Sequence, residues 1–173
     1  PLLAYHDHNG AKMRPRLLAE LAAGRSVAYA SEAGTPLVAD PGYQLVREAV
    51  AAGHPVTAAP GPSAALAALT VAGLPTDRFL FAGFLPAAAG QRRRALEELA
   101  KVPATLVFYE SPRRLAAMLS DAAAALGPGR PAAVCRELTK RFEECRRAPL
   151  GELAQALAAE PVKGEVVVLI GRG

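Results

Sequence analysis

The sequence predicts an α/β protein in which short buried strands alternate with helices. A short apolar run, Ser26 to Ala30, is followed by a loop of small residues and then by Tyr43 to Ala52, where apolar residues recur at helical spacing. A second apolar run, Pro55 to Ala59, leads in the same way into the loop Pro60 to Ala64 and a helix. Two strand–loop–helix units in tandem are typical of a parallel sheet with right-handed crossovers.

The loops after these two predicted strands are expected to line one rim and to bind a ligand. Right-handed crossovers bring both loops to the carboxyl edge of the sheet, where open α/β folds bind ligands. Gly34 lets a ligand approach the backbone closely, Thr35 offers a hydroxyl, and Pro36 stiffens the loop. In the second loop, Ser63 is placed to cap the helix from Ala64 to Val71. The alternative interpretation is that both loops are ordinary connections from a strand to a helix.

Periodicity and turn residues predict the remaining elements. Three leucines share one face of a helix predicted at 12–23, which Gly24 ends. Later in the chain, apolar runs with alternation or many valines predict strands, and helical spacing of apolar residues predicts helices. The predicted strands are Arg78–Phe84, Ala104–Tyr109, Ala132–Leu138, Phe142–Arg147 and Glu165–Ile170, and the predicted helices are Gln91–Lys101, Arg113–Leu126 and Gly151–Ala159.

Pairing and domain organisation follow from these elements. An antiparallel hairpin centred on Lys140 would place Cys135 opposite Cys145, and the valine-rich last strand is expected at the centre of its sheet. We expect a domain boundary at 74–77. Residues 1–77 would then belong to an N-terminal α/β domain and residues 78–173 to a C-terminal α/β domain with a mixed sheet. The first domain would be incomplete, with further strands before Pro1, because two parallel strands alone do not make a stable sheet.

Composition indicates a globular protein with a substantial core. Of the 173 residues, 51% are hydrophobic, and no apolar stretch approaches the roughly 20 residues needed to span a membrane. Two cysteines without metal-ligand spacing favour a reducing cytoplasm and no metal. The net charge is +4, and the whole excess lies in residues 87–173, which contain several pairs of basic residues. An anionic partner such as RNA is one interpretation, and a solvated helix face is the other.

Common catalytic motifs are absent from the sequence. It lacks G-x-x-x-x-G-K-[ST], G-x-G-x-x-G and G-x-S-x-G, which argues against a P-loop phosphotransferase, the common dinucleotide site and a serine hydrolase. The remaining polar groups occur at strand ends and in turns, where they suit orientation and charge stabilisation better than covalent catalysis. They are Glu110, Arg136, Glu137, Lys140, Glu143, Glu144 and Lys163.

Six motifs in order resemble those of a known family. They are SEAGTPLVADPG from Ser31, PGPSA from Pro60, GFLP from Gly83, FYESPRR from Phe108, CRELTKRFEE from Cys135 and KGEVV from Lys163. Together they resemble the bacterial 16S rRNA (cytidine 2′-O) methyltransferases of the tetrapyrrole-methylase-like superfamily. The resemblance implies two α/β domains with S-adenosyl-L-methionine in the cleft between them, a homodimer, and the small ribosomal subunit as partner. The family's first strand and glycine-rich loop have no counterpart in this sequence.

The resemblance also implies roles for individual residues. Catalytic candidates are Glu110, Glu137, Lys140 and Lys163. The cofactor-binding residues would be Gly34, Thr35, Pro36, Val38, Ser63, Ala64, Phe84 and Tyr109, with Thr35 standing where the superfamily has Asp. The RNA-binding residues would be Arg136, Lys140 and Arg141.

Several alternatives remain open from the residues alone. The base that takes the hydroxyl proton is not identified among the four catalytic candidates, and Arg136 and Glu137 could instead form a structural ion pair. A methyltransferase of a corrin or sirohaem precursor would suit the same fold, since an acidic tetrapyrrole also attracts arginine. A non-catalytic module for RNA binding or dimerisation is the remaining alternative.

Overall fold

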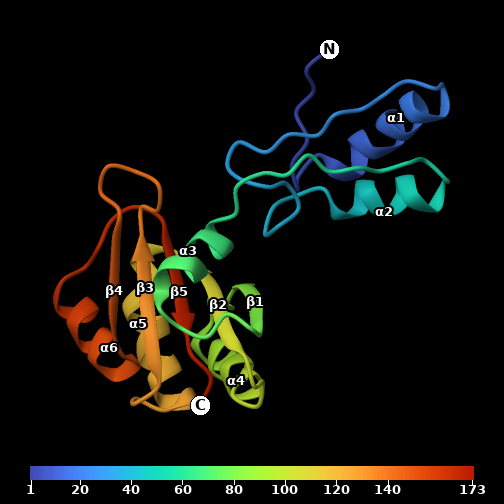
Figure 1. The fold of residues 1–173 in the computed structure, drawn as a ribbon. Helices are drawn as coiled ribbons and strands as arrows, with labels where there is room; N and C mark the ends of the chain where they lie inside the picture. Colours follow the sequence, from blue (N-terminus) through green and yellow to red (C-terminus); the bar gives the residue numbers. More distant parts are fainter. The chain divides into compact units, whose positions relative to one another are not determined.

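The computed structural model describes all 173 residues and contains six helices and five strands (Figure 1). By contacts, the chain divides into two compact units, residues 1–63 and residues 64–173. The helices are α1 (Gly10–Ala22), α2 (Tyr43–Ala51), α3 (Ala64–Ala72), α4 (Ala89–Leu99), α5 (Pro112–Leu126) and α6 (Leu150–Ala159). The strands are β1 (Phe79–Phe84), β2 (Thr105–Glu110), β3 (Pro131–Arg136), β4 (Glu144–Pro149) and β5 (Val166–Ile170).

The second unit is built on one mixed five-stranded sheet in the order β1-β2-β5-β3-β4. Strands β1 and β2 are parallel, and every other neighbouring pair is antiparallel. All five strands predicted after residue 77 are confirmed. Strand β5 lies at the centre of the sheet, as predicted, and its five residues are therefore all buried. The predicted hairpin is also confirmed: Cys135 pairs with Cys145, and their Sγ atoms lie 3.0 Å apart as free thiols.

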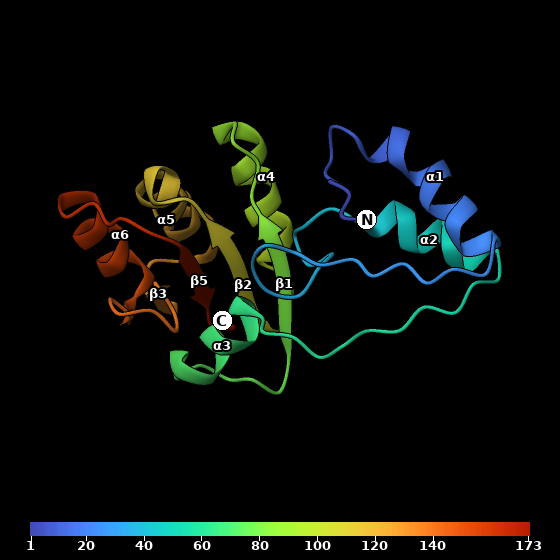
Figure 2. The same cartoon turned by 90° about the horizontal axis from the view of Figure 1, so that it is seen from above.

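Alternate residues of the central strands face two different helical layers. Helices α4, α5 and α6 cover one face, where Leu106, Phe108 and Val168 join the larger core cluster. Helix α3 covers the other face, where Val107 and Leu169 join a smaller cluster. Figure 2 shows α3 on one side of the strands and α4, α5 and α6 on the other. Helix α3 is therefore part of the second unit, although it comes before the boundary expected at 74–77, and the division into 1–77 and 78–173 stays a prediction.

The first unit contains two helices and extended segments, and no strand. Helices α1 and α2 pack against each other, and Leu17, Leu45 and Ala49 are buried. The strands predicted at 26–30 and 55–59 are wrong, because neither segment forms a sheet ladder with any residue of the chain. A β-strand needs a neighbour for its backbone N–H and C=O groups, and apolar character alone does not supply one.

None of the six helices combines the length and the apolar character that a membrane span requires.

Candidate functional site

In the first unit, the two loops that the sequence predicted to lie together are in direct contact. The backbone N–H of Thr35 donates to the carbonyl oxygen of Pro62 at 2.9 Å, and the Thr35 hydroxyl donates to the same oxygen at 3.0 Å. Glycines permit this approach: a Cβ on Gly34 would lie 3.2 Å from that oxygen, and a Cβ on Gly61 would lie 3.2 Å from the Thr35 hydroxyl. The contact forms without the predicted strands, so the loops themselves hold this rim together.

The first of these loops has an unusual backbone. Gly34, Leu37 and Ala39 all have positive φ angles, of 75°, 71° and 56°. Positive φ is costly for leucine and alanine, and such strain is concentrated at ligand-binding and active sites. Between the two strained residues, Val38 is 40% exposed. The loop therefore combines a strained backbone with an exposed apolar side chain, which makes it a candidate ligand-binding loop.

In the second unit, aromatic side chains gather where β1 and β2 end. The ring of Tyr109 lies edge-on to Phe81, with ring centres 4.8 Å apart, and to Phe84, with ring centres 5.8 Å apart. The Tyr109 hydroxyl accepts a hydrogen bond from the backbone N–H of Ala65 at 3.3 Å, at the beginning of α3. Three predicted cofactor residues, Phe84, Tyr109 and Ala64, are thus brought to the carboxyl ends of two parallel strands.

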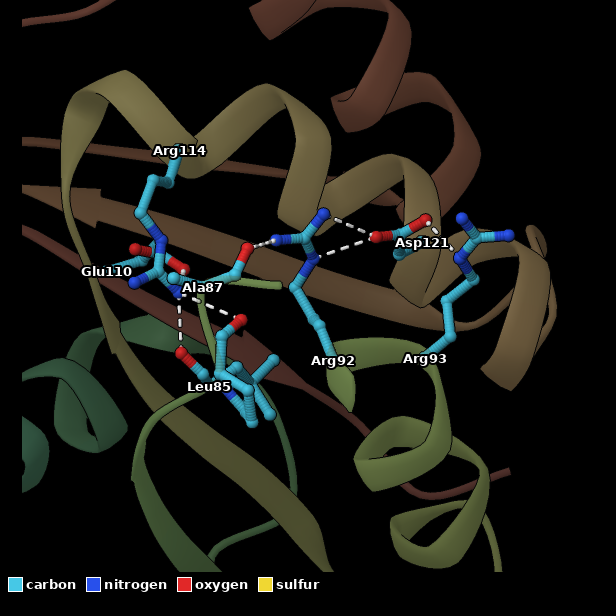
Figure 3. Close-up of polar contacts among 8 residues, drawn as sticks. Leu85, Ala87, Arg92, Arg93, Glu110, Arg114 and Asp121 are labelled. Carbon is cyan, nitrogen blue, oxygen red and sulfur yellow. Dashed lines mark hydrogen bonds and ion pairs between the residues drawn. The ribbon is translucent and has the colours of Figure 1, made fainter. Parts of the chain in front are cut away.

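Glu110 is buried, both oxygens of its carboxylate have partners, and one of these partners is Arg114 (Figure 3). One oxygen accepts the backbone N–H of Ser111 at 2.8 Å, and the other pairs with Arg114 at 3.1 Å. The same guanidinium donates to the carbonyl oxygen of Leu85 at 2.5 Å. These contacts join the end of β2 to the loop after β1. The geometry fits a carboxylate that positions this loop.

A second arginine, which is buried, holds the same loop from its other end. Arg92 donates to the carbonyl oxygen of Ala87 at 3.0 Å and pairs with Asp121 at 2.6 Å (Figure 3). Arg93 also reaches Asp121, at 3.4 Å. Two members of the basic run at 92–94 are therefore engaged within the fold, and the excess of arginine overstates the charge available to a partner.

The hairpin between β3 and β4 brings together two motifs that are distant in the sequence. The Glu137 carboxylate accepts the backbone N–H of Glu165 at 2.8 Å and pairs with Lys140 at 3.3 Å. Lys140 also pairs with Glu165 at 3.0 Å. The hydrogen bond from the Glu165 backbone lowers the pKa of Glu137, and the hydrogen bond to the Glu165 carboxylate raises the pKa of Lys140. Glu137 is consequently a weaker base than an ordinary carboxylate, and Lys140 is held as a cation.

Arg136 ties the base of the hairpin to the segment before β5. It donates to the carbonyl oxygen of Lys163 at 3.3 Å and pairs with Glu144 at 3.2 Å. Glu144 in turn pairs with Arg146 at 2.7 Å, which lowers the pKa of Glu144 and raises that of Arg146. The ion pair that the sequence left open for Arg136 is formed, with Glu144 as the partner in place of Glu137.

Strand register gathers the candidate residues of the second unit at one end of the sheet. Glu110 pairs with Val166, and Val166 pairs with Arg136 on its other side. Phe84 and Tyr109 occupy the same end through the β1–β2 pairing. The candidates Glu137, Lys140 and Lys163 follow in the connecting segments. The other predicted residues, Gly34, Thr35, Pro36, Val38 and Ser63, belong to the first unit.

Sequence reasoning missed three residues that organise this end of the sheet. Arg114 holds the loop after β1, and Glu165 is the partner of both Glu137 and Lys140. Gly164 has no side chain, and the Glu137 carboxylate fills the space that a Cβ on Gly164 would occupy. The motifs FYESPRR and KGEVV contain these three residues, so the sequence did single out the segments. It could not show which residues of other segments they contact.

Comparison with known proteins assigns the fold and the family. A family model described as tetrapyrrole (corrin/porphyrin) methylases matches residues 5–154, so the chain belongs to this family. Solved structures agree on the fold: the methyltransferase CobJ has a TM-score of 0.68 at 23% identity, covering 92% of this chain and 70% of that chain. A uroporphyrin-III C-methyl transferase from Thermus thermophilus, complexed with S-adenosyl homocysteine, has a TM-score of 0.64 at 24% identity, covering 97% and 75%.

Relatives found by sequence have a higher sequence identity to this chain than the solved structures have. A Mesorhizobium japonicum protein named ribosomal RNA small subunit methyltransferase I is 58% identical over 169 residues, covering 97% of this chain and 58% of the relative. Proteins of the same name from Pseudomonas aeruginosa and Escherichia coli O157:H7 are each 47% identical, covering 98% of this chain and 61% and 60% of the relatives. The chain thus spans about three fifths of the length of these relatives.

Proposed function

We propose that the protein carrying this chain is an S-adenosyl-L-methionine-dependent methyltransferase of ribosomal RNA, acting on the 2′-hydroxyl of a cytidine in 16S rRNA. The observation that carries the proposal is the 58% identity over 169 residues to a protein named for this class of activity. The proposal further includes a homodimer that acts on the small ribosomal subunit in the cytoplasm. Size-exclusion chromatography with light scattering on the full-length protein tests the dimer.

The loops of the first unit fit an S-adenosyl-L-methionine nucleotide. Gly34 and Gly61 bring the two backbones together, and Val38 offers an exposed apolar surface for an adenine ring. The Thr35 hydroxyl donates to Pro62, so it keeps lone pairs with which to accept a hydrogen bond from a ligand. We propose Gly34, Thr35, Pro36, Val38 and Ser63 as cofactor-binding residues, with Ala64, Phe84 and Tyr109 of the second unit.

When bound, the cofactor would supply a methyl carbon on a sulfonium: the ribose oxygen would bond to that carbon, the carbon–sulfur bond would break with the sulfur leaving as a thioether, and the hydroxyl proton would pass to water. The chain's own residues contribute orientation, which can be worth an effective molarity of roughly 10⁵ M or more. Glu110 is buried against Arg114, the pKa of Glu137 is lowered, and Lys140 is held as a cation. We therefore propose that these three side chains, together with Lys163, orient the acceptor through the loop and the hairpin that they hold in place.

Methyl transfer to ribosomal subunits tests the proposal directly. Full-length protein with radiolabelled S-adenosyl-L-methionine should label the small subunit, and nuclease digestion followed by mass spectrometry should locate the label on the ribose of a cytidine. A porphyrinoid acceptor labelled in its place would establish a tetrapyrrole substrate. Cofactor binding without transfer to either acceptor would support a non-catalytic RNA-binding module.

Cofactor binding at the loop pair is tested by Gly34→Val. Gly34 has a φ of 75°, and a side chain there would crowd Pro62. Calorimetry with S-adenosylhomocysteine on full-length protein should show binding lost in the variant. Gly24→Val is a matched control, because Gly24 has a φ of 77° with open space around its Cβ position. Unchanged affinity in Gly34→Val would remove this loop from the cofactor site.

A further inference from the structure

The tip of the β3–β4 hairpin carries an exposed aromatic residue with a cation over its ring. Phe142 is 64% exposed, the most exposed aromatic side chain of the second unit among the large apolar residues. The Arg141 guanidinium carbon lies 5.5 Å from the centre of the Phe142 ring. A single exposed apolar side chain is common at a protein surface, so the feature that distinguishes this tip is the cation held over an exposed ring.

The hairpin is held in place below this tip. Glu137 and Lys140 form their ion pairs with each other and with Glu165, at the base of the loop. Across the loop, the backbone N–H of Thr139 donates to the Glu143 carboxylate at 2.5 Å. Glu137 and Thr139 have positive φ angles of 51° and 64°, and these contacts maintain that backbone. A braced loop loses little conformational entropy on binding, so the tip is preorganised to receive a ligand.

The charged side chains of the β3–β4 hairpin indicate which class of ligand its tip would bind. The cations near the base of the hairpin are already neutralised, since Arg136 and Arg146 pair with Glu144 and Lys140 pairs with two carboxylates. Arg141 makes no ion pair in the structure, and neither does Lys163 in the neighbouring segment. The tip thus offers an aromatic ring with an unpaired planar cation over one of its faces, while the neighbouring Glu143 carboxylate accepts the Thr139 backbone N–H. That combination recognises a nucleotide, whose base stacks and whose phosphate is negative.

We infer that Arg141 and Phe142 form a stacking platform for an unpaired base of RNA. The inference rests on the proposed function and deepens it by naming a contact that holds the RNA acceptor. The base stacks on the face of the Phe142 ring that Arg141 leaves open, and the Arg141 guanidinium meets the adjacent phosphate. The braced residues Glu137 and Lys140 position this platform. It occurs at the same end of the sheet as Phe84 and Tyr109.

RNA-binding measurements on full-length protein test the platform. Fluorescence anisotropy with a labelled 16S rRNA fragment should show Phe142→Ala weakening binding by roughly 5- to 150-fold, the usual loss for a stacked base. Phe142→Tyr keeps the ring and should restore affinity. Arg141→Ala should reduce the slope of log affinity against log salt concentration by about 0.7, the value for one contact to single-stranded nucleic acid. Calorimetry should find unchanged S-adenosylhomocysteine affinity in all three variants.

Phe79→Ala is the matched control. Phe79 is also exposed, at 43%, but it begins β1 and therefore lies at the opposite end of that strand from Phe84. Equal RNA affinity in Phe142→Ala and wild type would overturn the inference even if the wild type methylates rRNA. A loss of dimer in Phe142→Ala with RNA affinity unchanged would overturn it too, and would assign the tip to a second copy of the chain. RNA binding that depends on Phe142, without methyl transfer by the wild type, would contradict the proposed function alone.

Discussion

Replacing Gly164 by alanine should break the contact that fixes the β3–β4 hairpin. Gly164 has a φ of 95°, and a Cβ there would lie 2.3 Å from the Glu137 oxygen and 2.5 Å from its carboxyl carbon. The backbone alone should cost roughly 1–2 kcal/mol, because an L side chain is disfavoured in the left-handed region. The Glu137 carboxylate must also swing away, which removes its hydrogen bonds to the Glu165 N–H and to Lys140. The total loss should therefore exceed the backbone cost.

Urea denaturation of four proteins separates the two effects. The proteins are wild type, Gly164→Ala, Glu137→Ala and the double variant, and their unfolding free energies form a double-mutant cycle. In the Glu137→Ala background, Gly164→Ala should cost only the backbone strain. Gly83→Ala is a further control in the same sheet, with a φ of 63° and open space around its Cβ position. Additive effects in the cycle would refute the reasoning.

The pH of the assay provides a second check on the same contact. The pKa of Glu137 is lowered from its ordinary value of 4.5, chiefly by the backbone N–H of Glu165. A proton therefore binds to Glu137 less tightly in the folded state than in the unfolded state. The contribution of the ionised Glu137 carboxylate to the free energy of unfolding is fully present above pH 4.5. That contribution is lost as the pH falls through the lowered value. The non-additive part of the cycle should accordingly shrink in acid and stay constant near neutrality.

Three further predictions concern other contacts. Asp121→Ala leaves the Arg92 guanidinium buried without its carboxylate, so the unfolding free energy should fall by roughly 3–5 kcal/mol in urea denaturation; a loss near zero would mean that water solvates Arg92. Cys135 and Cys145 should react as two free thiols in reductant and form one intramolecular disulfide after diamide, seen by mass spectrometry as the loss of two hydrogens; a disulfide between chains would contradict their pairing. Lys140→Ala should lower rRNA methylation while leaving cofactor affinity nearly unchanged, whereas an equal loss of both would indicate a role in folding.

Most of the second unit could be predicted because its elements carry local signals. The strand Val166–Ile170 is a run of β-branched and aliphatic residues, which is typical of a strand buried on both faces. The hairpin register follows from counting residues outward from Lys140, and it placed Cys135 opposite Cys145 correctly. In both cases the information lies within a few residues of the feature. Side-chain periodicity and turn position determine pairing when the partner strand is close in sequence.

The first unit shows where such local reasoning fails. Residues 26–30 and 55–59 have the apolar character of strands, yet neither pairs with another segment. Whether an apolar run becomes a strand depends on a neighbour that may be far away in sequence, and apolar character does not report on that neighbour. The loops that follow still meet, because the contact between Thr35 and Pro62 depends on small residues in the loops themselves. The contact between the two loops was therefore predicted correctly, for a reason different from the one that predicted it, while ligand binding at these loops stays a prediction.

The candidate site was hardest to predict where charges pair within the fold. From the sequence, a run such as Arg136 to Arg141 indicates cations that are free for phosphate. In the structure, two of its basic residues hold backbone or carboxylate groups, and only Arg141 remains unpaired. The distinction requires knowing that Glu165 lies across the sheet, 25 residues beyond Lys140. The pattern of charges in the sequence thus indicates that the β3–β4 hairpin is part of the candidate site. Which of its charged side chains is available to a ligand depends on the ion pairs that each one forms in the structure. By this argument the residues proposed to contact RNA are those at the tip, and the paired cations below them hold the hairpin in place.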